Sequence, residues 1–201
     1  VIREQSAGER DRLVTLLTRK NGVIRAFVNG VRSPKSRNAA STGLLCYSDF
    51  VIEQKKNGVY TIIEAAAKEV FFLLREDIVS LSLAQYFAEL AYELSVREEE
   101  ADEFLRLLLN AIYFVAQNKR NKALIKAATE LRFLSLAGYM PSVIGCANCG
   151  KFESGTMYFS PYSGKLFCSD CIPEEKTVAL PLGVVTAMRH ICLSEPEKVF
   201  S

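Results

Sequence analysis

The chain has 201 residues, of which 49% are hydrophobic and 24% are charged. This balance is that of a globular protein and excludes extended disorder. The length fits one large domain or two to three small ones. No apolar run approaches the ~20 residues of a membrane-spanning helix, so we expect no membrane partner. Because the chain begins at Val1 without a methionine and ends abruptly at Ser201, we expect it to be truncated at both ends.

The net charge of +2 conceals a gradient along the chain. Residues 1–70 carry 12 basic and 7 acidic groups, whereas residues 71–140 carry 8 basic and 10 acidic groups. The basic groups are densest between Arg3 and Arg37. Such asymmetry favours a contact of the N-terminal third with nucleic acid or another acidic surface, with a merely solvated basic face as the alternative.

Residues 1–70 have the alternating hydrophobic pattern of β-strands. Four strand candidates are separated by polar or glycine-containing segments: 13–18, 23–28, 44–54 and 59–64. Residues 1–3 add the remnant of a fifth strand. The tetrapeptide KNGV lies in both hairpin connections, at 20–23 and 56–59, where Asn-Gly favours the positive φ angles of a type I′ turn. Five short strands predict an OB-fold barrel, with a small β-sandwich or an SH3-like barrel as alternatives.

Residues 71–144 change to the 3.6-residue period of helices. One hydrophobic stripe has the spacing i, i+4, i+7 and i+11: Leu83, Phe87, Leu90 and Leu94. The acidic residues 98–103 fit a helix start, where carboxylates interact favourably with the helix dipole. Pro181 is expected to open a final helix within 176–201, which returns to the helical domain. The predicted fold class is therefore multi-domain α+β.

The strongest chemical signal is a pair of CxxC motifs in residues 145–175. Cys146-x2-Cys149 is followed, after 18 residues, by Cys168-x2-Cys171. This spacing predicts an inserted zinc ribbon in which four thiolates hold one structural Zn²⁺, with a hairpin between the two motifs. The alternatives are disulfide or redox pairs, or four buried thiols. The site leaves no open position on the metal for a substrate.

Signals of catalysis are weak. His190 is the only histidine, so no histidine-based metal triad exists. The remaining cysteines, Cys46 and Cys192, lie in apolar surroundings and are expected to be small core residues. We expect that the chain is not an enzyme. A zinc-dependent hydrolase is the alternative, and the lone histidine and the closed four-cysteine site argue against it.

A basic barrel surface is the second signal. Arg25 and Phe27 alternate with aliphatic residues, so they are expected to share the outer face of a strand. A cation beside an aromatic ring suits single-stranded nucleic acid, because the charge meets phosphates and the ring stacks on bases. A further basic run, RSPKSR, covers 32–37 in the connection that follows. An exposed strand with no ligand is the alternative.

A third group of cations opens a later helix: Lys119, Arg120, Lys122 and Lys126, with Arg132 further along. This cluster suits contact with DNA or with an acidic peptide of a partner. A solvated helix face explains it equally well.

The predicted strands, helices and cysteine motifs, in this order along the chain, resemble the RecO family of bacterial DNA repair proteins. The resemblance covers nearly the whole chain and rests on these segments: GERDRLVTLLT (8–18), GVIRA (22–26), GVRSPKSR (30–37), LRFL (131–134), AGYMP (137–141), CANCG (146–150) and YFSP (158–161). It implies an OB-fold domain over 1–70, a helical domain over 71–144 and a zinc-binding element over 145–175. Some family members lack the cysteines, whereas this chain keeps all four.

The resemblance also implies a function. Family members bind single- and double-stranded DNA, anneal complementary strands and, with RecR, load RecA onto strands coated by single-stranded DNA-binding protein, whose acidic C-terminal tail they also bind. It implies a bacterial, cytoplasmic and nucleoid-associated protein. The matched positions for DNA contact are Arg19, Lys20, Arg25, Phe27, Arg32, Lys35 and Arg37. Candidates for the acidic tail are Lys122, Lys126 and Arg132. A zinc-ribbon adaptor that binds only proteins is the alternative function.

Overall fold

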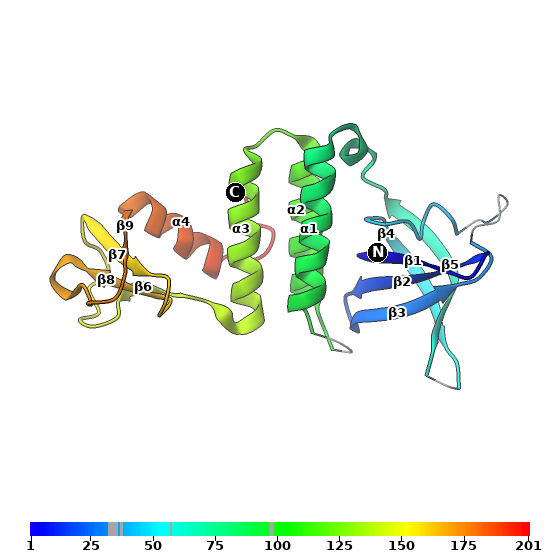
Figure 1. Ribbon diagram of the computed structural model, residues 1–201, viewed down its shortest axis with the longest axis horizontal. Helices are drawn as coiled ribbons and strands as arrows, with labels where there is room; N and C mark the ends of the chain where they lie inside the picture. Colours follow the sequence, from blue (N-terminus) through cyan, green and yellow to red (C-terminus); the bar gives the residue numbers. More distant parts are fainter. Residues whose placement is uncertain (32–35, 37, 57, 97–98) are drawn as a thin grey trace. The chain divides into compact units, whose positions relative to one another are not determined.

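The computed structural model describes residues 1–31, 36, 38–56, 58–96 and 99–201 (Figure 1). They form two compact units, Val1–Thr129 and Glu130–Ser201. The first unit contains a sheet followed by helices, and the second contains a smaller sheet with one helix after it. Among the helices of the described residues, none has the length and apolarity needed to cross a membrane.

The first sheet has five strands in the order β1-β2-β3-β5-β4. Their bounds are β1 (Arg3–Ala7), β2 (Asp11–Thr18), β3 (Gly22–Val28), β4 (Tyr47–Gln54) and β5 (Tyr60–Glu69). Neighbours are antiparallel except β3 and β5, which are parallel. The segments that lead into the two outer strands are joined, because the Leu45 amide donates to the Val1 carbonyl over 2.9 Å. This arrangement confirms the predicted five-stranded, OB-like barrel.

The barrel core is aliphatic and comes mainly from alternate positions of its strands. Fully buried residues include Val14, Leu16, Ala26, Val28 and Val31. In β3 the pattern is strict from Ile24 onward, with inward-facing aliphatic side chains alternating with outward-facing ones. Because side chains along a strand point to opposite faces in turn, the burial of one set exposes the other. The core therefore determines which side chains of β3 face solvent.

The strand predicted over 44–54 begins later, at Tyr47. Leu45 has a φ of 64°, a left-handed conformation that a β-strand does not contain. Cys46 thus lies immediately before the strand and not on it, although it is buried as expected.

The first KNGV connection is not the predicted type I′ turn. Gly22 has a φ of 54°, but Asn21 does not have the positive φ that a type I′ turn requires. Thr18 pairs with Gly22, so three residues lie between the paired positions and the loop is longer than two residues. In the second connection Gly58 has a φ of 80°, and Asn57 lies outside the described residues.

The helices of the first unit follow a short 3-10 segment, η1 (Phe72–Glu76). They are α1 (Ile78–Leu94), α2 (Asp102–Gln117) and the first part of α3 (Lys122–Leu134). Asp77 caps α1 by accepting hydrogen bonds from the backbone N–H groups of Val79 and Ser80, both 3.2 Å long. As predicted, acidic residues occupy the first turn of α2, namely Asp102 and Glu103. The helices α1 and α2 pack side by side (Figure 1).

The second unit contains the end of α3, a short π-helical turn η2 (Ser135–Tyr139) and a four-stranded sheet of order β6-β8-β7-β9. The strands are β6 (Ser142–Cys146), β7 (Thr156–Ser160), β8 (Lys165–Cys168) and β9 (Val178–Pro181), with a short 3-10 turn η3 (Ser169–Cys171) after β8. The hairpin predicted between the two CxxC motifs is formed by β7 and β8. Helix α4 (Leu182–Leu193) begins directly after Pro181, as expected.

Candidate metal centre and nucleic-acid interface

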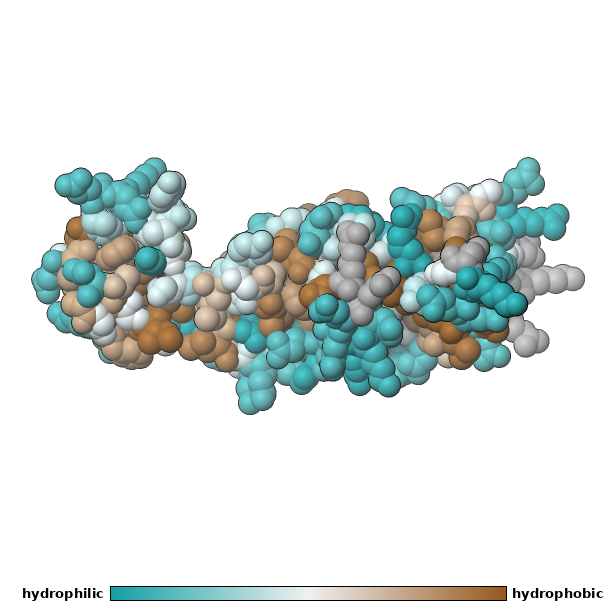
Figure 2. All heavy atoms as spheres, turned by 90° about the horizontal axis from the view of Figure 1, so that it is seen from below, coloured by the Kyte–Doolittle hydropathy of each residue, from teal (hydrophilic) through white to brown (hydrophobic). Residues whose placement is uncertain are grey.

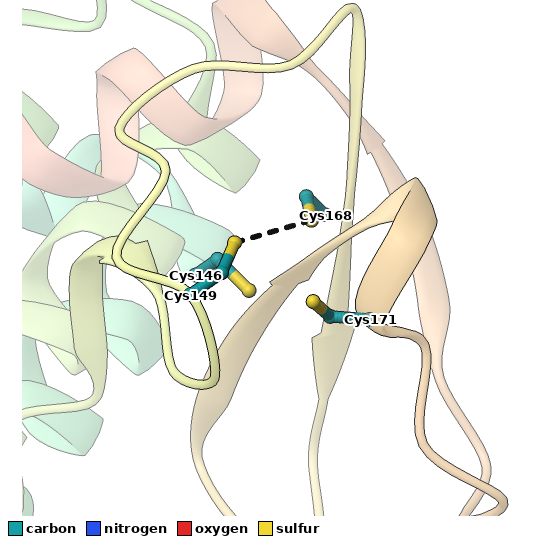
Figure 3. A group of neighbouring side chains, drawn as sticks. All are labelled: Cys146, Cys149, Cys168 and Cys171. Carbon is teal, nitrogen blue, oxygen red and sulfur yellow. Dashed lines mark hydrogen bonds between the residues drawn. The ribbon is translucent and has the colours of Figure 1, made fainter.

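The first cysteine pair lies at the end of β6 and in the turn after it. Cys146 is the last residue of β6, and its carbonyl accepts a hydrogen bond from the Gly150 amide over 2.9 Å. Gly150 has a φ of 74°, a conformation that glycine adopts without steric cost. This tight turn brings the side chain of Cys149 back beside that of Cys146 (Figure 3).

The second pair lies at the end of β8. Cys168 is the last residue of β8, and Cys171 ends the 3-10 turn η3. The parallel pairing of β6 with β8 places Cys146 opposite Leu166, two residues before Cys168. Sheet pairing therefore brings together two motifs that are separated in the sequence, and Figure 3 shows the four side chains converging.

The four sulfur atoms lie within 4.8 Å of one another. The Sγ atoms of Cys149 and Cys168 are 3.7 Å apart. Four thiolates at about 2.3 Å from one tetrahedral zinc ion would lie about 3.8 Å from each other, so the cluster fits such an ion. Cys146 and Cys168 are buried, while Cys149 is exposed. All four positions of a tetrahedral ion would be taken by protein, which leaves a site of structural and not catalytic type.

The surroundings act unequally on the thiols of the cluster, because they raise the pKa values of Cys168 and Cys171 but lower the pKa of Cys146. Burial alone would raise the pKa of Cys146, but hydrogen bonds from backbone groups of both motifs lower this pKa to about 6. The Asn148 side chain, inside the first motif, donates to the Sγ of Cys171 over 3.4 Å. This amide links the two motifs, and the cysteine spacing alone gave no sign of its role.

A buried arginine holds α4 against β6. Nε of Arg189 donates to the Val143 carbonyl, and one Nη donates to the Ile144 carbonyl, each over 2.8 Å. Its guanidinium carbon lies 3.9 Å from the ring centroid of Phe152. The role of this residue was not predicted from the sequence. The one signal for it was the position of a cation on an otherwise apolar helix face. His190 is exposed, and its Nε2 lies 2.9 Å from the Lys198 carbonyl oxygen.

The outer face of β3 carries the predicted combination of charge and ring. Arg25 is exposed, and Phe27, two residues on, is 36% exposed. The residue between them, Ala26, is fully buried. Their shared outward orientation confirms the expectation from the alternation of the sequence. In Figure 2, hydrophilic and hydrophobic residues lie side by side on the surface of the first unit, to which β3 belongs.

The hairpin between β2 and β3 carries two further candidates, Arg19 and Lys20. Nε of Arg19 lies 2.7 Å from Oδ1 of Asp102 in an ion pair. Lys20 is exposed and, within the described part of the chain, makes no ion pair. The other three candidates for DNA contact, Arg32, Lys35 and Arg37, lie outside the described residues.

The candidates for the acidic tail have different surroundings. Lys122 pairs with Asp77, and Nζ of Lys126 lies 5.2 Å from the ring centroid of Tyr86. Both lysines belong to the first unit. Arg132 belongs to the second unit, is buried and donates to the Cys192 carbonyl. Its guanidinium is thus not the exposed cation that the sequence analysis expected.

A five-stranded OB-like barrel, a helical middle and a four-cysteine element define a mixed α+β protein of modular construction. A family model described as Recombination protein O N terminal matches residues 1–71, and one described as Recombination protein O C terminal matches residues 75–191. The chain belongs to the RecO family, whose members are non-enzymatic recombination mediators. This membership agrees with the expectation that the chain is not an enzyme.

Curated relatives support the same family. The chain is 33% identical over 202 residues to the DNA repair protein RecO of Acetivibrio thermocellus, an alignment that covers 100% of this chain and 80% of the relative. It is 30% identical over 192 residues to the RecO of Dehalococcoides mccartyi, with 95% and 75% covered. It is 30% identical over 204 residues to the RecO of Desulfitobacterium hafniense, with 99% and 74% covered.

Proposed function

We propose that the chain is a DNA-binding recombination mediator whose barrel contacts single- and double-stranded DNA through the outer face of β3 and the adjoining loops. The observation that carries this proposal is the exposure of Arg25 and Phe27 on one face of the family's N-terminal barrel. The guanidinium neutralises a phosphate, and the ring offers a surface on which an unpaired base stacks. Lys20 and the predicted cations Arg32, Lys35 and Arg37 would extend this surface.

Strand annealing follows from the same electrostatics. Two complementary strands repel each other through their phosphates, and a surface that neutralises both lowers that repulsion. Contacts with phosphates carry little sequence information, so the activity would be independent of sequence. In this proposal the protein works with RecR to load RecA onto DNA coated by single-stranded DNA-binding protein, in the cytoplasm of a bacterium and in association with the nucleoid.

For the metal centre the proposal is one Zn²⁺ per chain, held by Cys146, Cys149, Cys168 and Cys171. The separations of the sulfur atoms fit a tetrahedral ion, and the lowered pKa of Cys146 favours its thiolate. The ion would join β6 to η3 and stiffen the second unit, within the proposed zinc element at 145–175. It supplies no reaction step.

For the acidic tail of single-stranded DNA-binding protein, the proposed contacts are Lys122 and Lys126, one helical turn apart on α3. Such a peptide needs cations beside an apolar surface. Near the first residues of α3, Leu124 exposes 71% of its surface and Ile78 exposes 74%. Arg132 would act by supporting the fold of its own unit and not by touching the peptide.

The experiment that tests DNA binding is charge reversal on the barrel. A fluorescein-labelled single strand of thymidines is titrated with the intact chain, with Arg25→Glu and with Lys35→Glu/Arg37→Glu. We expect each barrel variant to weaken binding by at least about ten-fold at low salt, since a phosphate contact is replaced by repulsion. The matched control is Lys176→Glu, an exposed lysine in the second unit.

Two outcomes would contradict the proposal. One is equal binding by the barrel variants and the wild type. The other is failure of the wild type to retain DNA at low salt while it binds an acidic, apolar-ended peptide, which would favour the zinc-ribbon adaptor.

A further inference from the structure

The β2–β3 hairpin lies directly against an acidic segment of its own chain. The Ala101 amide donates to the Arg19 carbonyl over 2.9 Å, and the Val23 amide donates to the Val96 carbonyl over 3.1 Å. These backbone bonds place Arg19 beside Asp102, at the first turn of α2. The neighbouring acidic groups Glu99, Glu100 and Glu103 are exposed.

The two cations of this hairpin, Arg19 and Lys20, therefore differ in whether they form an ion pair. Arg19 is already paired with Asp102, with 2.7 Å between Nε and Oδ1. Lys20 has no ion pair within the described residues. Asp102 also pairs with Arg106, with 3.5 Å between Oδ2 and Nη1, so one carboxylate is shared by two cations. A phosphate that approaches the guanidinium of Arg19 therefore also approaches this carboxylate. The phosphate and the Asp102 carboxylate repel each other at this distance, whether the phosphate replaces the carboxylate beside Arg19 or binds next to it.

The pair is partly exposed to solvent, although Oδ1 of Asp102 is itself buried. The Arg19 side chain is 62% exposed and that of Asp102 is 28% exposed. An ion pair exposed to this degree contributes little to the free energy of folding, so a variant that lacks it is expected to keep its surroundings folded. Because the hairpin is also held by the two backbone hydrogen bonds, loss of the ion pair leaves the hairpin in place.

We propose that Asp102 limits the DNA interface by competing with phosphate for Arg19. In the wild-type chain Lys20 and the outer face of β3 would contact DNA, while Arg19 stays paired with Asp102. The acidic start of α2 would form the boundary beyond which a bound strand does not run. This inference rests on the proposed DNA-binding function, and it assigns Asp102 a role as a residue that determines which cation meets phosphate.

The test is a four-member series: wild type, Asp102→Asn, Arg19→Gln and the double variant. Each is titrated with a fluorescein-labelled single strand of thymidines at several salt concentrations. On single strands one phosphate contact adds about 0.7 to the slope of log affinity against log salt. We expect Asp102→Asn to steepen the slope by about 0.7 and to tighten binding about 2- to 5-fold at low salt.

The other members distinguish competition from a general change in charge. Arg19→Gln alone should leave the slope unchanged, because Arg19 contacts no phosphate in the wild type. The double variant should return to the wild-type slope. The matched control is Glu174→Gln, which removes one exposed carboxylate in the second unit and should not steepen the slope.

Two results would overturn the inference while leaving DNA binding intact. They are an unchanged slope in Asp102→Asn, and a loss of about 0.7 in Arg19→Gln alone. Absence of DNA binding by the wild type would instead refute the proposed function. Thermal unfolding shows whether each variant is folded. If Asp102→Asn is not, Asp102→Ser makes the same test with another side chain suited to a helix start.

Discussion

The amide nitrogen of Val23 donates a hydrogen bond to the carbonyl oxygen of Val96, 3.1 Å away. This bond joins the first residues of β3 to the connection between α1 and α2, so the barrel and the helices of the first unit meet through their backbones. Gly22 lies next to this hydrogen bond. A Cβ atom built on Gly22 would lie 2.2 Å from the Val96 oxygen.

Gly22→Ala is therefore expected to destabilise the first unit. The left-handed conformation alone costs a non-glycine residue about 1–3 kcal/mol, and the backbone contact adds to that. Gly8→Ala is the matched control, because Gly8 has a φ of 70° but no heavy atom within 4 Å of the built Cβ. Urea unfolding should show a larger loss for Gly22→Ala, and equal losses would mean that the contact with Val96 is unimportant.

The metal centre gives a second prediction. Freshly reduced protein should contain about one zinc ion per chain, and Cys149→Ser or Cys171→Ser should lower this content to near zero, because three thiolates hold zinc far more weakly than four. Cys46→Ser is the control, since Cys46 is buried in the other unit and donates to the Ala40 carbonyl, as a serine can. The measurement is metal analysis by mass spectrometry. Less than about half an ion per wild-type chain would contradict the assignment.

The carboxylate of Asp77, at the start of α1, should make the stability of the fold depend on pH. Hydrogen bonds from Lys122 and then Ser80 hold the pKa of Asp77 well below its usual range. A lowered pKa in the folded state stabilises the fold above the unfolded value of about 4, and the stabilisation is lost as the pH falls below it. We expect Lys122→Met to lower the melting temperature at pH 7, and the difference from wild type to shrink towards pH 3. A difference that does not depend on pH would show that the charge of Asp77 is not involved.

Much of the site follows from local sequence pattern. The four cysteines were predictable because two residues between paired thiols encode a tight turn by themselves. The exposure of Arg25 and Phe27 was predictable because β3 alternates between buried and exposed residues from Ile24 onward. Each CxxC motif and the alternation of β3 depend on residues a few positions apart, whereas the meeting of the two motifs depends on the pairing of β6 with β8.

The remaining features depend on tertiary contacts. Nothing near Arg19 in the sequence indicates that Asp102 neutralises it. Arg132 looked like an exposed helix cation, but its guanidinium is buried against the Cys192 carbonyl. Because Leu45 has a left-handed φ, β4 begins only after it, and the sequence has no glycine at that position to indicate this conformation. Such pairings and backbone conformations are set by packing between distant segments, which periodicity does not encode.

The ring and the charge on β3 should contribute differently to DNA binding. Stacking of a base on an aromatic ring is worth about 1–3 kcal/mol and does not depend on salt, whereas a phosphate contact does. We therefore expect Phe27→Ala to weaken single-strand binding by about ten-fold with an unchanged salt slope. Arg25→Ala should instead reduce the slope by about 0.7. Fluorescence anisotropy measures both, and identical salt behaviour of the two variants would argue against separate roles.

The central claim, that a basic barrel binds DNA mainly through phosphates, is tested most directly by single-strand binding of the intact chain over a salt titration. With about four phosphate contacts, log affinity should fall against log salt with a slope near −3. A flat response to salt, or no binding at low salt, would contradict the claim.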